Sequence, residues 1–214
     1  MKGVRAVIFD FGGVVCHRPL PEWIALAAEA CGLSVPDFER AFWAHRLEYD
    51  SGRLEAFEYW REVARTAGIT LDDAQIPSLV RQEVRFWSRF DPRMMNWIGQ
   101  LRAEGFRTAI LSNLPRALGE ELLTRPDFAP HFDHLTLSYR LKMVKPEAGI
   151  YQHAIEGVGV LAGEALFLDD HARNVEGGRS VGLHAELFTT WEDLIEQDIA
   201  GRYGLPPPEL LQSR

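Results

Sequence analysis

The stretch Val4–Val15, VRAVIFDFGGVV, decides the fold that we expect for this chain. Its apolar run VIF (residues 7–9) ends abruptly at Asp10, and two glycines follow one residue later. Such a run, bounded by glycines, is typical of a buried strand in a parallel sheet. An acid at the carboxyl end of that strand would lie in the crevice where open α/β sheets bind ligands. Taken alone, Asp10 is better explained as a cap of the following turn than as a catalytic group.

Length, composition and charge indicate a globular protein and exclude some classes of partner. The 214 residues suffice for one large domain, or for a core with a smaller insertion. Hydrophobic residues make up 46% and charged residues 25%, which is ordinary for a soluble protein. The net charge of −8 argues against nucleic acid or an anionic membrane as a partner, because both require a positive field. A local basic pocket for a small phosphate is compatible with this charge.

Cysteine usage and hydropathy favour a reduced, cytoplasmic protein. The two cysteines, Cys16 and Cys31, provide no disulfide framework. The N-terminal residues do not follow the pattern of a signal peptide, and no apolar stretch approaches the length that crosses a bilayer. The sequence leaves the oligomeric state undetermined.

Residues 17–88 predict a helical insertion after the first strand. Apolar residues recur at helical spacing in four segments, with a turn at residues 50–52 and no strand between them. We therefore expect a small helical cap domain over residues 17–88. Its aromatic side chains should form its core, with one or two facing the substrate; they are Trp23, Phe42, Trp43, Phe57, Trp60, Phe86 and Trp87. We expect its arginines, Arg18, Arg46 and Arg53, on solvated helix faces, although each could meet polar groups of a substrate.

From Asp91 onward, helical and strand patterns alternate. Further buried strands are indicated at residues 108–111, 134–138, 165–168 and 183–187, with helices between them. This alternation predicts an α/β fold with a doubly wound parallel sheet that is covered by helices on both faces. We assign residues 1–16 and 89–205 to this core domain and residues 206–214 to an exposed tail.

Polar groups follow three of the predicted strands, and a lysine precedes a helix. They are Asp10, Ser112-Asn113, Asp169-Asp170 and Lys145. Because parallel strands place their carboxyl ends at one edge, these groups can converge. Three neighbouring acids repel one another unless a cation joins them, and Mg²⁺ with its preference for oxygen ligands would do so. Such a set can bind a phosphoryl group and attack it.

Four short motifs in order strengthen this interpretation. They are FDFGG (residues 9–13), LSN (111–113), KPE (145–147) and LDDHARN (168–174). The sequence resembles the haloacid dehalogenase-like superfamily of hydrolases over essentially its whole length, in the branch with a helical cap after the first strand. Within that branch it is most similar to bacterial phosphatases that act on sugar phosphates, including the α-glucose-1-phosphate type. Each motif is weak alone, but four at strand ends are specific.

The resemblance implies a Mg²⁺-dependent phosphatase for a small phosphorylated metabolite. Asp10 would be the nucleophile and form an aspartyl-phosphate that water then hydrolyses. Ser112 and the Asn113 backbone would hold the phosphoryl oxygens, and Lys145 would neutralise charge beside the nucleophile.

The resemblance also implies the metal ligands. Asp10, the Gly12 carbonyl and Asp170 would bind Mg²⁺, with support from Asp169.

The sequence departs from the family at one position, because most of these phosphatases have a second aspartate where this chain has Gly12. In those phosphatases the second aspartate is the general acid and base, and losing such a group typically costs about 10²- to 10⁴-fold in rate. A phosphatase could compensate with an acidic leaving group, such as a sugar 1-phosphate provides, or with His17 or His171 as the proton donor. A haloacid dehalogenase needs no such proton, but the pair Asp169-Asp170 then lacks a purpose. A non-catalytic protein that binds a phosphorylated ligand is the third alternative.

Overall fold

The computed structural model describes residues 3–208 and contains a five-stranded parallel sheet in the order β3-β2-β1-β4-β5. The predicted doubly wound α/β fold is confirmed. The chain moves from β1 outward to one edge and then returns to build the other, so β1 and β4 flank the point where strand order reverses. The strands are β1 (Ala6–Phe9), β2 (Arg107–Ser112), β3 (His134–Leu137), β4 (Ala165–Asp169) and β5 (His184–Leu187).

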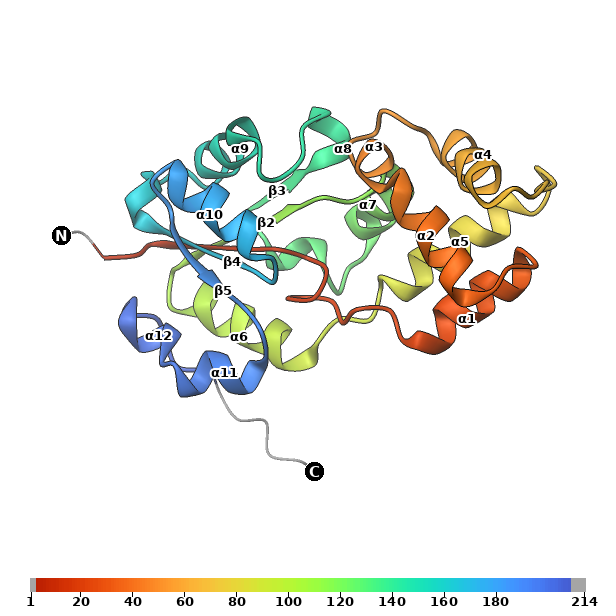
Figure 1. Ribbon diagram of the computed structural model, residues 1–214. Coiled ribbons are helices and arrows are strands. Elements are labelled where there is room, and N and C mark those ends of the chain that lie inside the picture. The colour runs from red at the N-terminus through yellow and green to blue at the C-terminus, as the bar shows by residue number, and fades with distance from the viewer. Residues whose placement is uncertain (1–2, 209–214) are drawn as a thin grey trace, which may run out of the picture.

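Helices cover both faces of the sheet, which is why its central strands are continuous apolar runs (Figure 1). Successive side chains of a strand point to opposite faces. Ile8 packs in the cluster that includes residues of α9 (Ala148–Val158) and α10 (Ala172–Ser180). Val7 and Phe9 pack in the cluster on the other face, which includes residues of further core helices. Those helices are α6 (Pro92–Ala103), α7 (Arg116–Thr124), α11 (Trp191–Glu196) and α12 (Ile199–Arg202).

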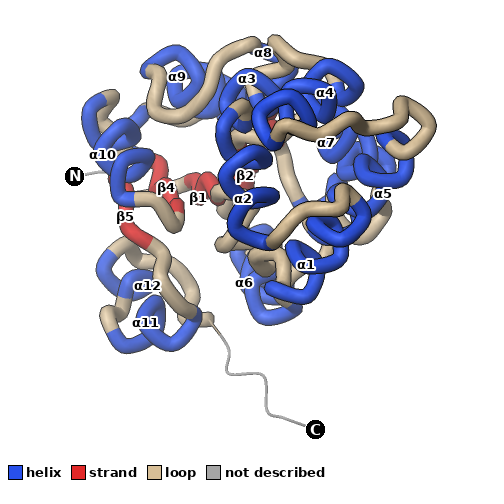
Figure 2. The backbone as a smooth tube through the Cα atoms, turned by 45° about the vertical axis from the view of Figure 1, so that its right-hand side comes forward, coloured by secondary structure: helices blue, strands red, loops and turns tan. Residues whose placement is uncertain are grey.

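The cap lies between β1 and α6 in the chain, and its helices lie beside the sheet domain (Figure 2). It has a hydrophobic core of its own. It contains five helices, whereas the sequence predicted four. The additional helix, α3, begins at Arg46 because the backbone of His45 leaves helical geometry there and ends α2. Of the aromatic residues expected in the core, Trp43 and Phe57 are instead exposed. The helices are α1 (Pro21–Ala30), α2 (Val35–Ala44), α3 (Arg46–Asp50), α4 (Ala56–Ala67) and α5 (Ile76–Phe86).

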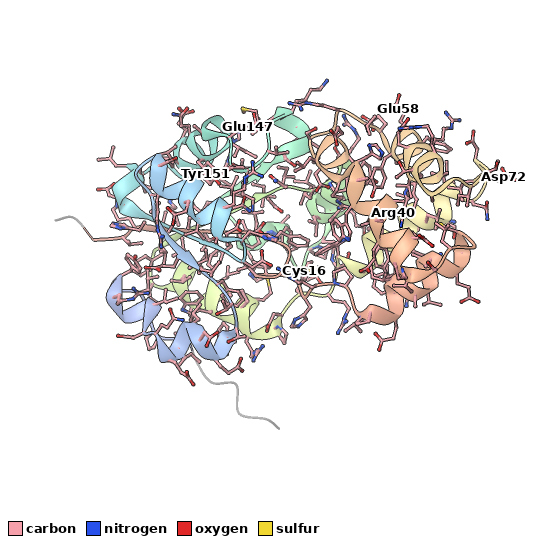
Figure 3. All side chains as sticks on the ribbon, in the orientation of Figure 1. Cys16, Arg40, Glu58, Asp72, Glu147 and Tyr151 are labelled. Carbon is pink, nitrogen blue, oxygen red and sulfur yellow. The ribbon has the colours of Figure 1, made fainter. Side chains whose placement is uncertain are left out.

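Two chain segments join cap and core side by side. Cys16 forms an antiparallel bridge with Phe90, and His17 N donates to the Arg89 carbonyl over 2.9 Å. Figure 3 labels Cys16 at this junction. The boundaries expected at residues 16–17 and 88–89 fall within these segments, and the division into domains stays a prediction.

The C-terminal region differs from expectation in one respect. The apolar spacing of residues 191–199 predicts one helix, but α11 and α12 are separate because Asp198 adopts a left-handed backbone (φ +48°). Of the predicted tail, Pro206 accepts a hydrogen bond from Trp97 Nε1 over 2.9 Å, and residues 209–214 lie outside the described residues. No helix within residues 3–208 combines the length and apolar character needed to cross a membrane.

Candidate active site

The candidate site lies at the carboxyl ends of β1 and β4, where strand order reverses. The ammonium nitrogen of Lys145 lies 2.7 Å from Asp10 Oδ1 and 2.6 Å from Asp169 Oδ2. All three side chains are almost fully buried. Residues separated by as many as 159 positions therefore form one buried ionic cluster, as the strand-end argument predicted.

Asn113, just after β2, fixes the lysine. Its Oδ1 accepts a hydrogen bond from Lys145 N over 2.8 Å, and its Nδ2 donates to the Lys145 carbonyl over 3.3 Å. The ring of Phe167 lies beneath the ammonium, 5.6 Å from ring centroid to Nζ. Burial alone would lower the pKa of Lys145, but Asp10 and Asp169 outweigh it and raise the pKa above its ordinary value. Lys145 is therefore a fixed cation.

The carboxylate of Asp10 is oriented by its own turn. Oδ1 accepts a hydrogen bond from Phe11 N over 2.7 Å as well as the contact from Lys145. Burial raises the pKa of Asp10 to about 7, against the opposing effect of Lys145, and Asp169 raises it further. A bound cation would favour the ionised, nucleophilic form.

Asp169 is held by hydrogen bonds from α10 as well as by the lysine. It accepts from the backbone nitrogen of His171 over 2.8 Å and from Asn174 Nδ2 over 3.0 Å. These contacts fix the start of α10 against β4, so Asp169 orients its neighbours rather than facing the open cavity. The side chain of Asn174 therefore lies beside the acids and not on the outer surface of α10.

The acids at this edge suit a divalent cation. Ligand oxygens of Asp10, Asp169 and Asp170 all lie within 4.8 Å of one another. Oδ1 of Asp170 is buried and makes no hydrogen bond with any described residue, whereas Oδ2 accepts from Arg18 Nε over 3.0 Å. A set of oxygen donors that includes a buried oxygen without a hydrogen bond fits Mg²⁺, which prefers such ligands and retains several waters.

Glycine at positions 12 and 13 has a clear steric reason. Gly13 has φ +81°, and a Cβ there would lie 2.1 Å from Asp170 Oδ2. A Cβ on Gly12 would lie 2.8 Å from Cζ3 of Trp87, at the end of the cap. The space beside Gly12 is therefore taken by the indole ring, and the second family aspartate has no room in this arrangement.

The site opens into a cavity of about 510 Å³ between core and cap. Ser112 and Asn113 line it from the core together with Asp10 and Lys145. The cap contributes apolar and charged side chains in similar number; they are Arg18, Pro19, Ile24, Glu39, Trp43, Arg46, Asp50 and Trp87. Trp43 and Trp87 are thus the aromatic cap residues that face the site.

A further expectation about the cap is wrong. Arg46 was expected on a solvated helix face, but it is buried, with Nε 2.8 Å from Asp50 Oδ1 and with Nη1 donating to Glu83. The tyrosine hydroxyl of Tyr49 also reaches Glu83, over 3.4 Å. The spacing i,i+4 between Arg46 and Asp50 was the signal in the sequence, but their partner on α5 was not foreseeable.

The two histidines considered as proton donors differ in location. His171 lines the cavity, yet its side chain is 65% exposed and its ring lies 3.6 Å from Asp170. His17 lies in a neighbouring cavity, which it shares with Asp91 and Arg93.

The fold and the ionic cluster define a class of hydrolase, and the sequence matches that class. Residues 4–182 match the family of haloacid dehalogenase-like hydrolases, so the chain belongs to this family.

Relatives by sequence include several phosphatases. D-ribitol-5-phosphate phosphatase of Bacteroides thetaiotaomicron is 24% identical, over 84% of this chain and 89% of the relative. Sesquiterpene phosphatase astK of Aspergillus oryzae is 25% identical, over 84% and 87%. Drimenol cyclase drtB of Aspergillus calidoustus is 25% identical over 95% of this chain, which spans 37% of that protein's length.

Solved structures share the fold. A HAD family enzyme from Bacteroides thetaiotaomicron, solved as a magnesium complex, has a TM-score of 0.74 and 22% identity, with 92% of this chain and 99% of that chain covered. L-2-haloacid dehalogenase from Xanthobacter autotrophicus has a TM-score of 0.68 and 18% identity, over 94% and 84%.

Proposed function

We propose that this hydrolase is a Mg²⁺-dependent phosphatase that cleaves a small phosphate monoester through an aspartyl-phosphate on Asp10. The observation that carries the proposal is the placement of the Lys145 ammonium between Asp10 and Asp169 at the floor of the cavity. A phosphoryl group is negatively charged and repels a carboxylate. Because the Lys145 ammonium offsets this repulsion, the Asp10 carboxylate can approach the phosphorus.

In the proposed reaction, Asp10 attacks phosphorus in line with the leaving oxygen. Ser112 and the backbone of Asn113 hold the phosphoryl oxygens, and Lys145 stabilises the charge that spreads over them. Asp10, the Gly12 carbonyl and Asp170 would hold Mg²⁺, with Asp169 as support. When bound, Mg²⁺ supplies charge neutralisation between the nucleophile and the phosphate.

Two observations favour this activity over the alternatives. A dehalogenase needs no metal, whereas Asp170 Oδ1 is buried, lies 3.6 Å from His171 Nε2 and accepts no hydrogen bond among the described residues, which suits a ligand of a cation. A binding protein without activity has no need of a buried nucleophile, whereas Asp10 here makes a 2.7 Å contact with Lys145. Several relatives are phosphatases, and a neighbouring structure was solved with magnesium and inorganic phosphate.

The substrate is a small metabolite whose organic part faces the cap. Trp43 and Trp87 line the cavity, and their aromatic rings can pack against a sugar ring or against a hydrocarbon chain. A panel that contains sugar phosphates, polyol phosphates and prenyl monophosphates separates these two kinds of substrate.

The test is hydrolysis of p-nitrophenyl phosphate and of the panel with Mg²⁺, before and after chelation. We expect turnover that requires Mg²⁺, and we expect Asp10→Asn to abolish it. Asp127→Asn is the matched control, because Asp127 is an exposed acid paired with Arg125. Turnover unchanged in Asp10→Asn, or no hydrolysis of any phosphate by the wild type, would overturn the proposal.

A further inference from the structure

We propose that Asp50, at the end of α3 in the cap, is the general acid and base of the reaction and replaces a side chain at position 12. The inference rests on the proposed phosphatase function. It assigns to the cap a chemical step, in addition to closing the cavity over the substrate.

The first support is position. Asp50 lines the same cavity as Asp10, Lys145 and Gly12. Its backbone carbonyl accepts a hydrogen bond from Ser138 Oγ, which in turn accepts from Leu114 N over 2.9 Å. Leu114 directly follows the proposed phosphate-binding residues, so Asp50 is tied to the loop that would hold the phosphoryl group.

The turn after Asp50 reinforces this attachment. Gly52 has φ +67°, and a Cβ there would lie only 2.7 Å from the carbonyl oxygen of Tyr139. The turn is pressed against α8 (Ser138–Leu141), and α3 contacts α8. The cap is therefore anchored to the core beside Asp50, the residue that faces the site.

The second support is charge. One buried cation, Arg46, contacts two buried carboxyl groups, Asp50 and Glu83. Glu83 receives hydrogen bonds from Arg46 and from Tyr49. Asp50 Oδ1 lies 2.8 Å from Arg46 Nε but accepts no aligned hydrogen bond within residues 3–208. Because one cation compensates one of the two anions, Asp50 is the carboxyl group that can retain a proton.

The surroundings of Asp50 agree with this assignment. Burial raises the pKa of Asp50 to about 7, against the opposing effect of Arg46; Glu83 raises it further and Lys145 lowers it. The phenols of Tyr49 and Tyr59 also face this cluster. A carboxyl group that titrates near neutral pH can both give and take a proton at the working pH.

The other titratable cap and rim groups at the cavity are less suited. Glu39 is exposed, and the side chain of His171 is 65% exposed. Bulk water competes with a substrate for both groups, whereas Asp50 is 6% exposed.

The proposed proton path balances over two steps. In the first, Asp10 forms a bond to phosphorus, the bond from phosphorus to the leaving oxygen breaks, and that oxygen takes the proton of the Asp50 carboxyl to leave as an alcohol. In the second, the Asp50 carboxylate takes a proton from water as the water oxygen attacks phosphorus. Inorganic phosphate leaves, Asp10 is again a carboxylate and Asp50 is again protonated.

The main test compares Asp50→Asn with the wild type on two aryl phosphates. Phenyl phosphate needs a proton on its leaving oxygen, and we expect its kcat/KM to fall about 10²- to 10⁴-fold. p-Nitrophenyl phosphate needs none in the first step, so we expect a burst of nitrophenolate followed by accumulation of phosphorylated Asp10, visible by mass spectrometry. Asp73→Asn, on the exposed outer surface of the cap, is the matched control and should keep wild-type kinetics.

Two further measurements apply even if Asp50→Asn folds poorly. In the wild type, kcat/KM for phenyl phosphate should fall on the alkaline side as Asp50 ionises. Glu83→Gln removes an anion that favours the protonated form of Asp50, so this alkaline limb should move to lower pH. A purely structural role of the cluster predicts loss of activity without such a movement.

The outcomes separate the two proposals. If Asp10→Asn abolishes turnover while Asp50→Asn keeps wild-type kcat/KM on phenyl phosphate, the role of Asp50 is overturned and the phosphatase stands. Failure of Glu83→Gln to move the alkaline limb also overturns the role of Asp50. No turnover of any phosphate by the wild type removes both.

Discussion

The indole ring of Trp87 occupies the space into which a side chain at Gly12 would project, with 2.8 Å between the ring carbon Cζ3 and an ideal Cβ. Trp87 lies at the end of α5 and belongs to the cap, whereas Gly12 follows β1 of the core. The absence of the usual family aspartate is thus matched by a bulky group from the other side of the cavity. The two residues form a complementary pair across the junction.

Restoring the family residue should therefore fail. We expect Gly12→Asp to lower the free energy of unfolding by about 1–3 kcal/mol, as overpacking does, and not to increase turnover of phenyl phosphate. Combining it with Trp87→Ala should cost less than the sum of the single changes, because the residues are in contact. Denaturant unfolding measures the free energies of unfolding of the single and double variants. Gly99→Asp is the control, because a Cβ at Gly99 would meet open space. A faster single variant Gly12→Asp would contradict this view of the pair.

The buried lysine should be essential to stability as well as to activity. Lys145→Met leaves Asp10 and Asp169 facing each other without a cation, and breaking a buried pair in this way costs about 3–5 kcal/mol. The loss should be larger at pH 8 than at pH 5, because protonation relieves the repulsion at low pH. Thermal unfolding at the two pH values measures this loss of stability. Lys142→Met is the control, because Lys142 is exposed. Equal losses at both pH values would speak against charge as the cause.

Arg18 should compete with the metal for Asp170. Its guanidinium, on a side chain that is 62% exposed, pairs with a carboxylate that is 7% exposed. An exposed ion pair contributes about 0.2–1 kcal/mol, so Arg18→Gln should tighten Mg²⁺ binding about 1.5- to 5-fold. Titration calorimetry with Mg²⁺ alone measures the affinity, and Arg53→Gln is the control. Weaker binding in Arg18→Gln would show that Arg18 supports the metal site instead.

Stability should fall as the pH rises through the acidic range. In the folded state the pKa of Asp50 and of Asp10 is about 7, above the ordinary value of 3.8, so the folded protein binds more protons between about pH 4 and pH 7. Each such group lowers the free energy of unfolding by about 1.4 kcal/mol per pH unit in this window. Asp50→Asn should remove the contribution of Asp50 and so reduce the slope of unfolding free energy against pH. Denaturant unfolding at several pH values, in the presence of a chelator, measures this slope. An unchanged slope would mean that Asp50 is ionised throughout.

The sequence by itself determined the sheet and the residues at its carboxyl edge. Strand patterns and their polar ends sufficed, because parallel strands bring their carboxyl ends together whatever the length of chain between them. Asp10 and Asp169 could be placed in one site on that ground, whereas Lys145 follows no strand directly and was placed there by its KPE motif. Helix boundaries were less determined, since continuous periodicity hid the break at His45.

Only the tertiary structure decided how the cap meets this site. The contact of Arg46 with Asp50 and Glu83 joins two helices whose relative position depends on packing, not on local spacing. In the same way, the fit of Trp87 against Gly12 requires both sides of the junction. Local sequence specifies which face of a helix is apolar, but the side chains that oppose each other across a cavity are fixed by the whole arrangement of packed elements.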